Sequence, residues 1–411
     1  MTLTSNTNCR MCGSSDLQLI IDLGSQPLAN AFIHADKLSN AEEKYPLKVY
    51  FCGDCHLSQL IDVVDPVTLY EDYIYFSSGV STLSEHFSTY AESVTSQFLD
   101  ANDLVVEIAS NDGVFLNWFS DREYRVIGVE PALNIAKVSR SLGIPTLTEF
   151  FSESLANRIL SSHGEAKAII SNNVVAHIND HRDLAMGVKL LLHEQGVWVI
   201  ELPHMLDMFE NLAYDTIYHE HLSYFSVRPM KKWLNGNGLE VFDVEITPVH
   251  GQSLRAFVGH EGAHPVSERV GEVIEREISL GMDRVEEYHT LADRIAVSSE
   301  SVSRVLEDLK QAGKSIAAYG APAKGNTLLN YCHIDEHTLD YAVDDLPQKQ
   351  GKYTPGSRLL CISREDAELN LPDYFVLLAW NYEKPIMKKE AAFLENGGHF
   401  IIPIGDEIRI V

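Results

Sequence analysis

The stretch 214-YDTIYHEHLSYFS-226 holds the densest group of side chains able to do chemistry, because Tyr218, His219, Glu220 and His221 are consecutive. Such residues serve as metal ligands, as acids and bases, or as parts of an ordinary strand of mixed polarity. The second His of H-E-x-x-H is absent, so a zinc protease helix is unsupported. In a strand, Tyr218 and Glu220 would share one face and the two histidines the other. An imidazole tuned near neutrality, with a carboxylate to orient it, favours acid–base chemistry, and a purely structural strand stays open.

Four of the six cysteines form two C-x-x-C pairs near the N-terminus. Each pair can place two thiolates on one side of a tight knuckle, and two knuckles complete a tetrahedron around Zn²⁺. Four sulfur ligands leave no open coordination position, so we expect a structural ion. Free thiols, or one redox pair, are the alternative. The predicted zinc ligands are Cys9, Cys12, Cys52 and Cys55.

A small polar turn, 107-EIASNDG-113, follows an apolar run and precedes a helical pattern. It does not match G-x-G-x-x-G, so a standard dinucleotide fingerprint is absent. Glu130 ends the next apolar run, where an acid can accept hydrogen bonds from a ribose diol. This combination suits S-adenosylmethionine better than NAD, and an ordinary α/β turn is the alternative. The candidate cofactor-binding residues are Glu107, Ala109, Asn111, Asp112, Gly113, Glu130, Pro131, Asn172 and Asn173.

The stretch 172-NNVVAH-177 comes at the end of a third apolar run. In an open α/β sheet, the carboxyl ends of the strands line the ligand crevice. His177 is therefore a candidate acid, base or substrate contact. A His bonded to a neighbouring loop is an equally good interpretation of this position.

A second glycine turn, 320-GAPAKGNT-327, occurs where a strand meets a helix. It does not match G-x-x-x-x-G-K-[ST], because the Lys precedes the second Gly, so a phosphate-hydrolysing P-loop is excluded. Backbone N–H groups, the helix dipole and a lysine can still hold a phosphate. A solvated loop is the alternative. The candidate substrate-binding residues are Gly320, Lys324, Asn326, Lys349 and Lys352.

The elements that must position these residues follow an α/β rhythm. Apolar runs at 104–110, 124–132, 166–178 and 196–204 predict strands with helices between them, which implies a doubly wound sheet. A charged helical pattern covers 266–311, and the α/β rhythm then restarts. The predicted α/β fold has a small zinc-binding domain, a central Rossmann-like domain for S-adenosylmethionine, a helical linker and a smaller Rossmann-like domain. We place these at residues 1–75, 76–260, 261–312 and 313–411.

Composition restricts the partners. The 411 residues carry a formal net charge of −27, which argues against a nucleic-acid polymer, since phosphate backbones need clustered Lys and Arg. No apolar run approaches the roughly 20 residues of a membrane span. The start of the chain, MTLTSNTNCR, has no basic-then-apolar signal pattern. We expect a soluble cytoplasmic protein without a membrane partner, either a monomer or a homodimer.

The ordered motifs CRMCGS, DLGSQPLANAF, CGDC, VEIASNDG, IYHEHLSYFS, YGAPAKGNTLLN, VDDLPQKQGKYTPG and LLAWNY span essentially the whole chain. Together they resemble the sugar C-methyltransferases of deoxysugar biosynthesis, which methylate carbon 3 of nucleotide-linked 4-keto sugars. The resemblance implies three domains, with zinc in the first, S-adenosylmethionine in the second and a Rossmann-like third. Where many relatives have Gly in the first cofactor motif, this chain has Ala109.

The resemblance also implies roles for single residues. The Tyr-x-Glu-His signature of that family falls on Tyr218, Glu220 and His221, and its strand-end His falls on His177. An active-site Tyr falls in 73-YIYFSS-78, at Tyr75, with Tyr73 as the alternative. The expected mechanism has His221 remove a proton beside the ketone, Tyr218 or His177 donate to the enolate oxygen, and the carbanion attack the methyl group. Glu220 would hold the imidazole if this stretch forms a loop, and would otherwise have another role. A sugar O- or N-methyltransferase and a non-catalytic nucleotide-sugar binding protein are the rivals.

Overall fold

A computed structural model describes residues 3–70, 76–79, 83–248 and 251–411. The chain divides into two compact units, and neither is one continuous stretch. The first unit comprises residues 1–18, 50–205 and 222–283. The second comprises residues 19–49, 206–221 and 284–411. Tyr218 to His221, here called the YHEH residues, therefore belong to the same unit as the C-terminal part of the chain. The four cysteines of the C-x-x-C pairs and the first cofactor motif belong to the other unit.

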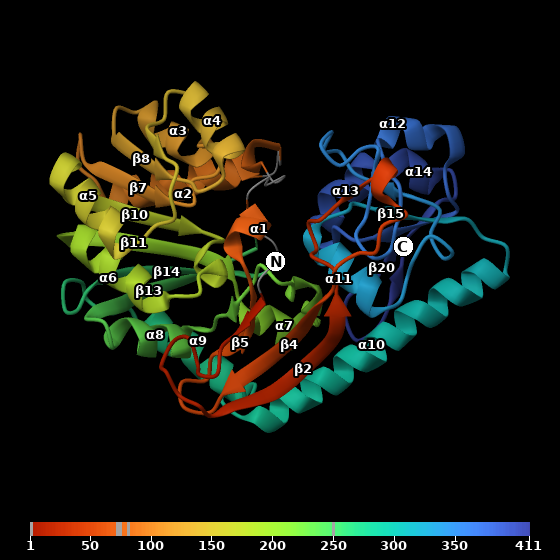
Figure 1. The fold of residues 1–411 in the computed structure, drawn as a ribbon, viewed down its shortest axis with the longest axis horizontal. Helices are drawn as coiled ribbons and strands as arrows, with labels where there is room; N and C mark the ends of the chain where they lie inside the picture. The colour runs from red at the N-terminus through yellow and green to blue at the C-terminus, as the bar shows by residue number, and fades with distance from the viewer. Residues whose placement is uncertain (1–2, 71–75, 80–82, 249–250) are drawn as a thin grey trace. The chain divides into compact units, whose positions relative to one another are not determined.

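The first unit is built on a seven-stranded sheet with strand order β13-β14-β11-β10-β7-β8-β9 (Figure 1). The five strands from β11 to β9 in this order are parallel, and β14 and β13 continue the sheet in antiparallel fashion. The strands are β7 (Leu104–Ile108), β8 (Arg125–Val129), β9 (Thr146–Leu147), β10 (Ala166–Asn172), β11 (Leu192–Pro203), β13 (Leu239–Thr247) and β14 (Ser253–His260). The predicted strands at 104–110, 124–132, 166–178 and 196–204 correspond to β7, β8, β10 and β11.

Helices cover both faces of this sheet because its central strands are apolar on both sides. Leu104 and Val106 of β7 pack with helices α5, α6 and α8, whereas Val105 packs with α2 and α3. Side-chain oxygens start two of these helices: Ser152 accepts from the Leu155 N–H, and Asp180 caps α6. The helices of this unit are α1 (Pro66–Tyr70), α2 (Leu83–Phe98), α3 (Val114–Ser120), α4 (Leu133–Ser141), α5 (Glu153–His163), α6 (His181–Leu191), α8 (Val227–Asn235) and α9 (Glu268–Ser279).

The second unit has a six-stranded sheet with strand order β18-β16-β15-β19-β20-β21, parallel except for β21. Its core is aromatic, with Tyr319, Phe375 and Phe400 in contact. The strands are β15 (Ile316–Tyr319), β16 (Ala342–Val343), β18 (Cys361–Ile362), β19 (Tyr374–Leu377), β20 (His399–Ile402) and β21 (Arg409–Ile410). The helices beyond the first unit are α7 (Met205–Asn211), α10 (Val285–Gln311), α11 (Ala323–Tyr331), α12 (Arg364–Ala367), α13 (Glu383–Lys389) and α14 (Ala391–Glu395).

The shorter strands pair outside the two large sheets. These pairs are β1 (Leu3–Ser5) with β6 (Asp62–Val64), β5 (Ser58–Leu60) with β12 (Ser223–Tyr224), and β3 (Ile33–His34) with β17 (Lys352–Tyr353). Two longer strands, β2 (Leu17–Gln26) and β4 (Tyr45–Cys52), run through the residue boundaries of the two units. The helical pattern over 266–311 forms two helices, because α9 ends before Gly281, whose φ of 73° is left-handed.

The mixed α/β architecture with a second, smaller parallel sheet confirms the predicted fold class. The strand geometry considered for Tyr218 to His221 is not found, and these residues form a turn instead. Tyr214–Thr216 form a 3-10 helix, and residues 218–221 form a turn closed by the His221 N–H, which donates to the Tyr218 carbonyl over 2.9 Å. The strand β12 begins only at Ser223. Alternating faces therefore do not describe these side chains.

Candidate active site and metal centre

The two C-x-x-C pairs form knuckles with the same backbone hydrogen bonds. In the first, the Gly13 N–H donates to the Cys9 carbonyl over 2.8 Å, and in the second the His56 N–H donates to the Cys52 carbonyl, also over 2.8 Å. Gly13 and His56 both take left-handed φ angles, of 75° and 64°. The equivalent turns present all four sulfurs to one point.

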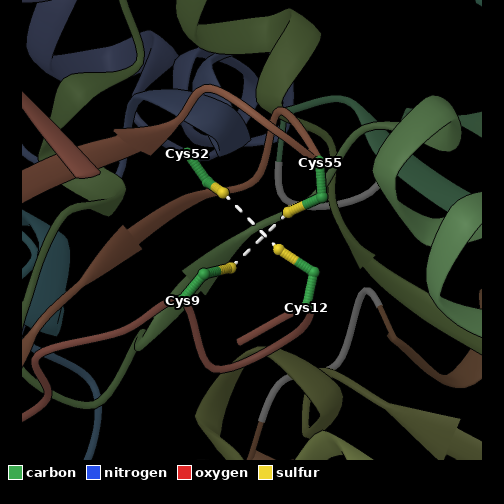
Figure 2. Close-up of side chains that lie close together, drawn as sticks. All are labelled: Cys9, Cys12, Cys52 and Cys55. Carbon is green, nitrogen blue, oxygen red and sulfur yellow. Dashed lines mark hydrogen bonds between the residues drawn. The ribbon is translucent and has the colours of Figure 1, made fainter. Parts of the chain in front are cut away.

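The four sulfurs lie within 4.8 Å of one another, and Figure 2 shows them converging from opposite sides. Cys9 Sγ is 3.5 Å from Cys55 Sγ, and Cys12 Sγ is 3.6 Å from Cys52 Sγ. A tetrahedral zinc ion with bonds of about 2.3 Å requires sulfur atoms about 3.8 Å apart, so the cluster fits the ion. The predicted zinc-ligating set is thus brought together.

The predicted cofactor turn lies at the carboxyl end of β7 and is held in unusual backbone conformations. Ala109, Asn111 and Gly113 have φ angles of 57°, 49° and 80°, and Asn173, after β10, has 52°. Left-handed residues other than Gly cost free energy and concentrate at ligand sites. The turn is anchored in part by the Asn111 and Asp112 side chains, which accept from the Ser77 and Ser78 N–H groups over 2.9 and 3.0 Å.

Buried acceptors surround this turn. Among the residues that the structure describes, one side-chain oxygen on each of Glu107, Asp112, Asn172 and Asn173 is buried and has no hydrogen-bond partner. Burial raises the pKa of Glu107, and the charges of Asp112 and Glu130 add to the rise. Buried polar atoms are nearly always satisfied, so this group calls for a ligand rich in donors. The ammonium and ribose hydroxyls of S-adenosylmethionine are such donors, and the residues present fit it.

Glu130, directly after β8, holds two backbone segments together. Its Oε2 accepts from the Asn111 N–H over 3.0 Å, and its Oε1 accepts from the Ala132 N–H over 2.8 Å. Each carboxylate oxygen can accept a second hydrogen bond, so both remain able to bind hydroxyls. Burial raises the pKa of Glu130 to about 7. Pro131 lies between Glu130 and Ala132 in sequence, and its ring fixes φ, which restricts the backbone at the carboxyl end of the strand.

His177 lies at the end of a 3-10 turn, Val175–His177, rather than on β10, which ends at Asn172. Its Nδ1 is 2.9 Å from the hydroxyl of Tyr70, and the two rings stack. Tyr70 was not predicted from the sequence, where nothing marked it apart from other tyrosines. The predicted Tyr75, and its alternative Tyr73, lie outside the described residues.

The YHEH turn places the imidazole of His221 between two partners. Its Nδ1 is 2.7 Å from the carbonyl oxygen of Thr216, and its Nε2 is 2.7 Å from the hydroxyl of Tyr218. A carbonyl only accepts, so Nδ1 carries the proton and Nε2 carries the lone pair, which accepts from the Tyr218 O–H. The two rings pack with centroids 4.0 Å apart. Tyr218 and His221 thus form a hydrogen-bonded pair with a defined tautomer.

The two neighbours of His221 in sequence have other contacts. Glu220 Oε1 accepts from Asn30 Nδ2 over 2.6 Å. His219 is only 2% exposed, and its Nε2 donates to the Tyr45 carbonyl over 3.2 Å. Asn30 and Tyr45 come from the N-terminal residues of the same unit. These contacts hold the turn in place from both sides.

The second glycine turn follows β15. Gly320 has a φ of 85°, and a Cβ there would lie 3.0 Å from the Cβ of Ala379, so only Gly fits. Asn326 Nδ2 donates to the Ala29 carbonyl over 2.7 Å. Lys352 lies half-buried on β17. Gly320 thus lies in a turn between a strand and a helix, as the sequence predicts. The predicted polar residues of this site differ from one another in their exposure and in their hydrogen-bond partners.

The two remaining lysines differ in their partners. Lys349 Nζ donates to the Ala321 carbonyl over 2.9 Å and pairs with Asp344 Oδ2 at 3.1 Å. Lys324 Nζ is buried without a hydrogen bond in the described part of the chain, 3.9 Å from the Trp380 ring centroid. Burial lowers the pKa of Lys324 to about 8, opposed by the charge of Asp215. Lys324 is thus the lysine with hydrogen-bonding capacity to spare.

Family models match three parts of the chain. Residues 9–70 match a zinc binding domain, residues 84–244 a methyltransferase domain, and residues 248–405 a C-methyltransferase C-terminal domain. The C-methyltransferase NovU of Streptomyces niveus is 35% identical over 405 residues, which is 98% of this chain and 96% of that protein. The chain belongs to this C-methyltransferase family. It is an S-adenosylmethionine-dependent C-methyltransferase with a zinc-binding cysteine cluster.

Two solved methyltransferase structures each resemble less than half of the chain, and only weakly. A methyltransferase from Clostridium acetobutylicum has a TM-score of 0.35 and 12% identity, covering 45% of this chain and 94% of its own. One from Anabaena variabilis has a TM-score of 0.32 and 14% identity, covering 44% and 95%. Both are described as S-adenosylmethionine-dependent, but likeness at this level carries no argument about chemistry. No helix among the described residues is long and apolar enough to cross a membrane.

Proposed function

We propose that this C-methyltransferase adds a methyl group to carbon 3 of a nucleotide-linked 4-keto deoxysugar, through an enolate. The observation that carries the proposal is the His221–Tyr218 pair. Methylation at carbon differs from methylation at oxygen or nitrogen because a C–H bond must first be broken. That step needs a base, and Nε2 of His221 is an imidazole nitrogen whose lone pair is fixed by the bond from Nδ1 to the Thr216 carbonyl.

The proton step is assigned to the Tyr218–His221 pair. A C–H beside a ketone is acidic because its electron pair becomes the carbon–carbon double bond of an enolate. In our proposal the proton passes to Nε2 of His221, with the Tyr218 hydroxyl moving aside or relaying it. The ketone oxygen gains negative charge and needs a donor, for which Tyr218 and His177 are the proposed residues. The imidazolium then releases its proton to solvent.

The methyl donor is assigned to the first unit. When bound, S-adenosylmethionine supplies an electrophilic methyl group on a sulfonium. We propose that Glu130 accepts from its ribose hydroxyls and that the unpartnered oxygens of Glu107, Asp112, Asn172 and Asn173 accept from its other donors. Ala109, Asn111, Gly113 and Pro131 shape the backbone around it.

The anionic end of the substrate is assigned to the second glycine turn. Lys324 is the lysine that we favour for the diphosphate, because its ammonium has no hydrogen bond to give up among the described residues. Gly320 and Asn326 shape that turn, and the half-buried Lys352 is a second positive group in the same unit. Lys349 is already bonded to Asp344, so releasing it would cost a buried ion pair.

The test is an assay with thymidine-, GDP- and CDP-linked 4-keto sugars and S-adenosylmethionine, followed by mass and NMR analysis of the products. We expect S-adenosylhomocysteine release with at least one of these sugars and a new methyl signal attached to carbon 3. A methyl group on oxygen or nitrogen would replace this proposal by the O- or N-methyltransferase alternative. Absence of any turnover across the panel would favour another carbon acid as substrate.

A further inference from the structure

Asp215 anchors the short 3-10 helix that precedes the YHEH turn. It is fully buried, and its Oδ2 accepts from the Trp380 indole N–H over 2.7 Å. Trp380 begins another 3-10 helix, Trp380–Tyr382, after β19 in the C-terminal sheet of the same unit. Neither residue was assigned a role from the sequence.

The anchored helix leads directly to the imidazole. Its backbone is closed by the Ile217 N–H, which donates to the Tyr214 carbonyl over 2.9 Å. The residue after Asp215 is Thr216, whose carbonyl oxygen lies 2.7 Å from Nδ1 of His221. The position of this one carbonyl decides which nitrogen of His221 is protonated, and therefore which nitrogen can act as a base. A shift of the 3-10 helix would alter the tautomer and the tilt of the ring together.

Electrostatic interactions also favour the hydrogen bond between Trp380 and Asp215. Burial raises the pKa of Asp215, while the nearby ammonium of Lys324 and the Trp380 bond oppose the rise. The Lys324 ammonium also lies over the indole face, 3.9 Å from the ring centroid. The Trp380 indole is therefore held by two interactions, a cation–π contact between its face and Lys324 and the hydrogen bond from its N–H to the Asp215 carboxylate. Trp380 thus contacts both Asp215, which is buried, and Lys324, which like Trp380 is partly exposed.

We propose that the Trp380–Asp215 hydrogen bond is a positioning device that fixes the tautomer and orientation of His221. This inference rests on the proposed function, in which His221 is the base. Trp380 and Asp215 are positioning residues, since they act through the Thr216 carbonyl and not on the substrate. Loss of the bond should slow proton removal without weakening the binding of either the sugar or S-adenosylmethionine.

The experiment compares variants that keep or remove this bond. Trp380→Phe removes the N–H and keeps a ring under Lys324. Asp215→Ala removes the acceptor, whereas Asp215→Asn keeps an oxygen that can accept. Tyr319→Phe is the matched control, because it removes one hydrogen bond of 2.8 Å, to Glu390, from the same unit. Each variant is assayed at pH 8 for exchange of the proton beside the ketone with D₂O, for KM of the sugar nucleotide, and for S-adenosylmethionine affinity.

We expect Trp380→Phe and Asp215→Ala to lower kcat for exchange about tenfold, with cofactor affinity changed less than twofold in both. The KM of the sugar nucleotide should change less than twofold in Trp380→Phe, which keeps the charge of Asp215 beside Lys324. Asp215→Asn should recover most of the rate, and Tyr319→Phe should match the wild type. Nitrogen-15 NMR of labelled histidines, with His221 assigned by His221→Asn, should show a single tautomer in the wild type and a mixture in Trp380→Phe.

Equal exchange rates and spectra in Trp380→Phe and Tyr319→Phe would overturn the inference. If Trp380→Phe does not fold, the Asp215 pair decides, since equal rates in Asp215→Ala and Asp215→Asn would overturn it too. Failure of the proposed function looks different: the wild type would show no exchange, or His221→Asn would keep it.

Discussion

The acid that follows β8 in the first unit and the acid that follows β16 in the second occupy equivalent places in their sheets. Glu130 accepts from the N–H of the turn after β7 and from the N–H two residues further along its own segment. Asp344 likewise accepts from the Ala321 N–H over 2.8 Å, in the turn after β15, and from the Leu346 N–H over 3.0 Å. Both carboxylates thus tie two neighbouring strand ends together.

The two carboxylates differ in whether a lysine pairs with them. Lys349 pairs with Asp344 at 3.1 Å and neutralises it, whereas no described residue forms an ion pair with Glu130. A carboxylate with a built-in counter-ion is a structural part, while one without it can bind a ligand with donors or positive charge. The same backbone arrangement thus agrees with the two sites that we propose, one for a cationic cofactor at Glu130 and one for an anion at Lys324.

Removing the counter-ion should have the largest effect. Lys349→Met would leave Asp344 charged, mostly buried and uncompensated, so we expect the free energy of unfolding to fall by about 3–5 kcal/mol. Lys352→Met, at the half-buried lysine nearby in sequence, should change it by less than about 1 kcal/mol. Urea unfolding of both variants makes the comparison, and equal losses would show that the ion pair is not what distinguishes Asp344.

Replacing Glu130 and Asp344 one at a time should show which of them contributes to cofactor binding and which contributes only to stability. Glu130→Ala should weaken S-adenosylmethionine binding by about 100-fold, because hydrogen bonds to a charged group contribute about 1.5–3 kcal/mol. Asp344→Ala should leave this affinity within about twofold and act on stability alone. Calorimetric titration measures both. A weak effect of Glu130→Ala would remove the carboxylate from the cofactor site.

The pH dependence should distinguish the two acids more finely. Burial raises the pKa of Glu130 to about 7 in the free protein. The protonated carboxyl therefore adds to the free energy of unfolding below about pH 4.5, and this contribution is lost as the pH rises through 7. A cationic cofactor prefers the ionised form, so its affinity should rise up to about tenfold between pH 6 and pH 8. In Glu130→Gln the affinity should be flat across this window, and a flat wild-type profile would count against the assignment.

The smallest expected effect concerns backbone strain in the first turn. Ala109 has a φ of 57°, a conformation that Gly adopts without a steric cost. Ala109→Gly should therefore stabilise the protein by about 0.5–1 kcal/mol, measured as a higher melting temperature. Ala136→Gly, in the middle of α4, should destabilise it instead, by about 1 kcal/mol. Destabilisation by both changes would mean that the turn is not strained.

The features that could be predicted from the sequence are those that depend on a local pattern of residues. Runs such as 104-LVVEI-108 are apolar at every position but one, and they became central strands. The cysteine spacing located the metal cluster because a knuckle is a local structure. The φ angle of Ala109 also explains why a Gly suits this position.

Contacts between distant residues could not be predicted in the same way. The sequence left both a strand and a loop open for the YHEH stretch, and contacts from Asn30 and Tyr45, far away in the sequence, accompany a turn. Trp380 stands in the quoted LLAWNY motif, yet nothing in the sequence pairs it with Asp215. Lys349 was expected to bind a phosphate, but it forms an ion pair with Asp344, five residues earlier in the sequence.

The central claim is that His221 removes the proton beside the ketone. The direct measurement is NMR-detected exchange of that proton with D₂O, in the presence of S-adenosylhomocysteine, for the wild type, His221→Asn and the neighbouring His219→Asn. The account predicts exchange in the wild type, its loss by at least about 100-fold in His221→Asn with cofactor affinity unchanged, and its retention in folded His219→Asn. Exchange at the wild-type rate in His221→Asn would contradict it.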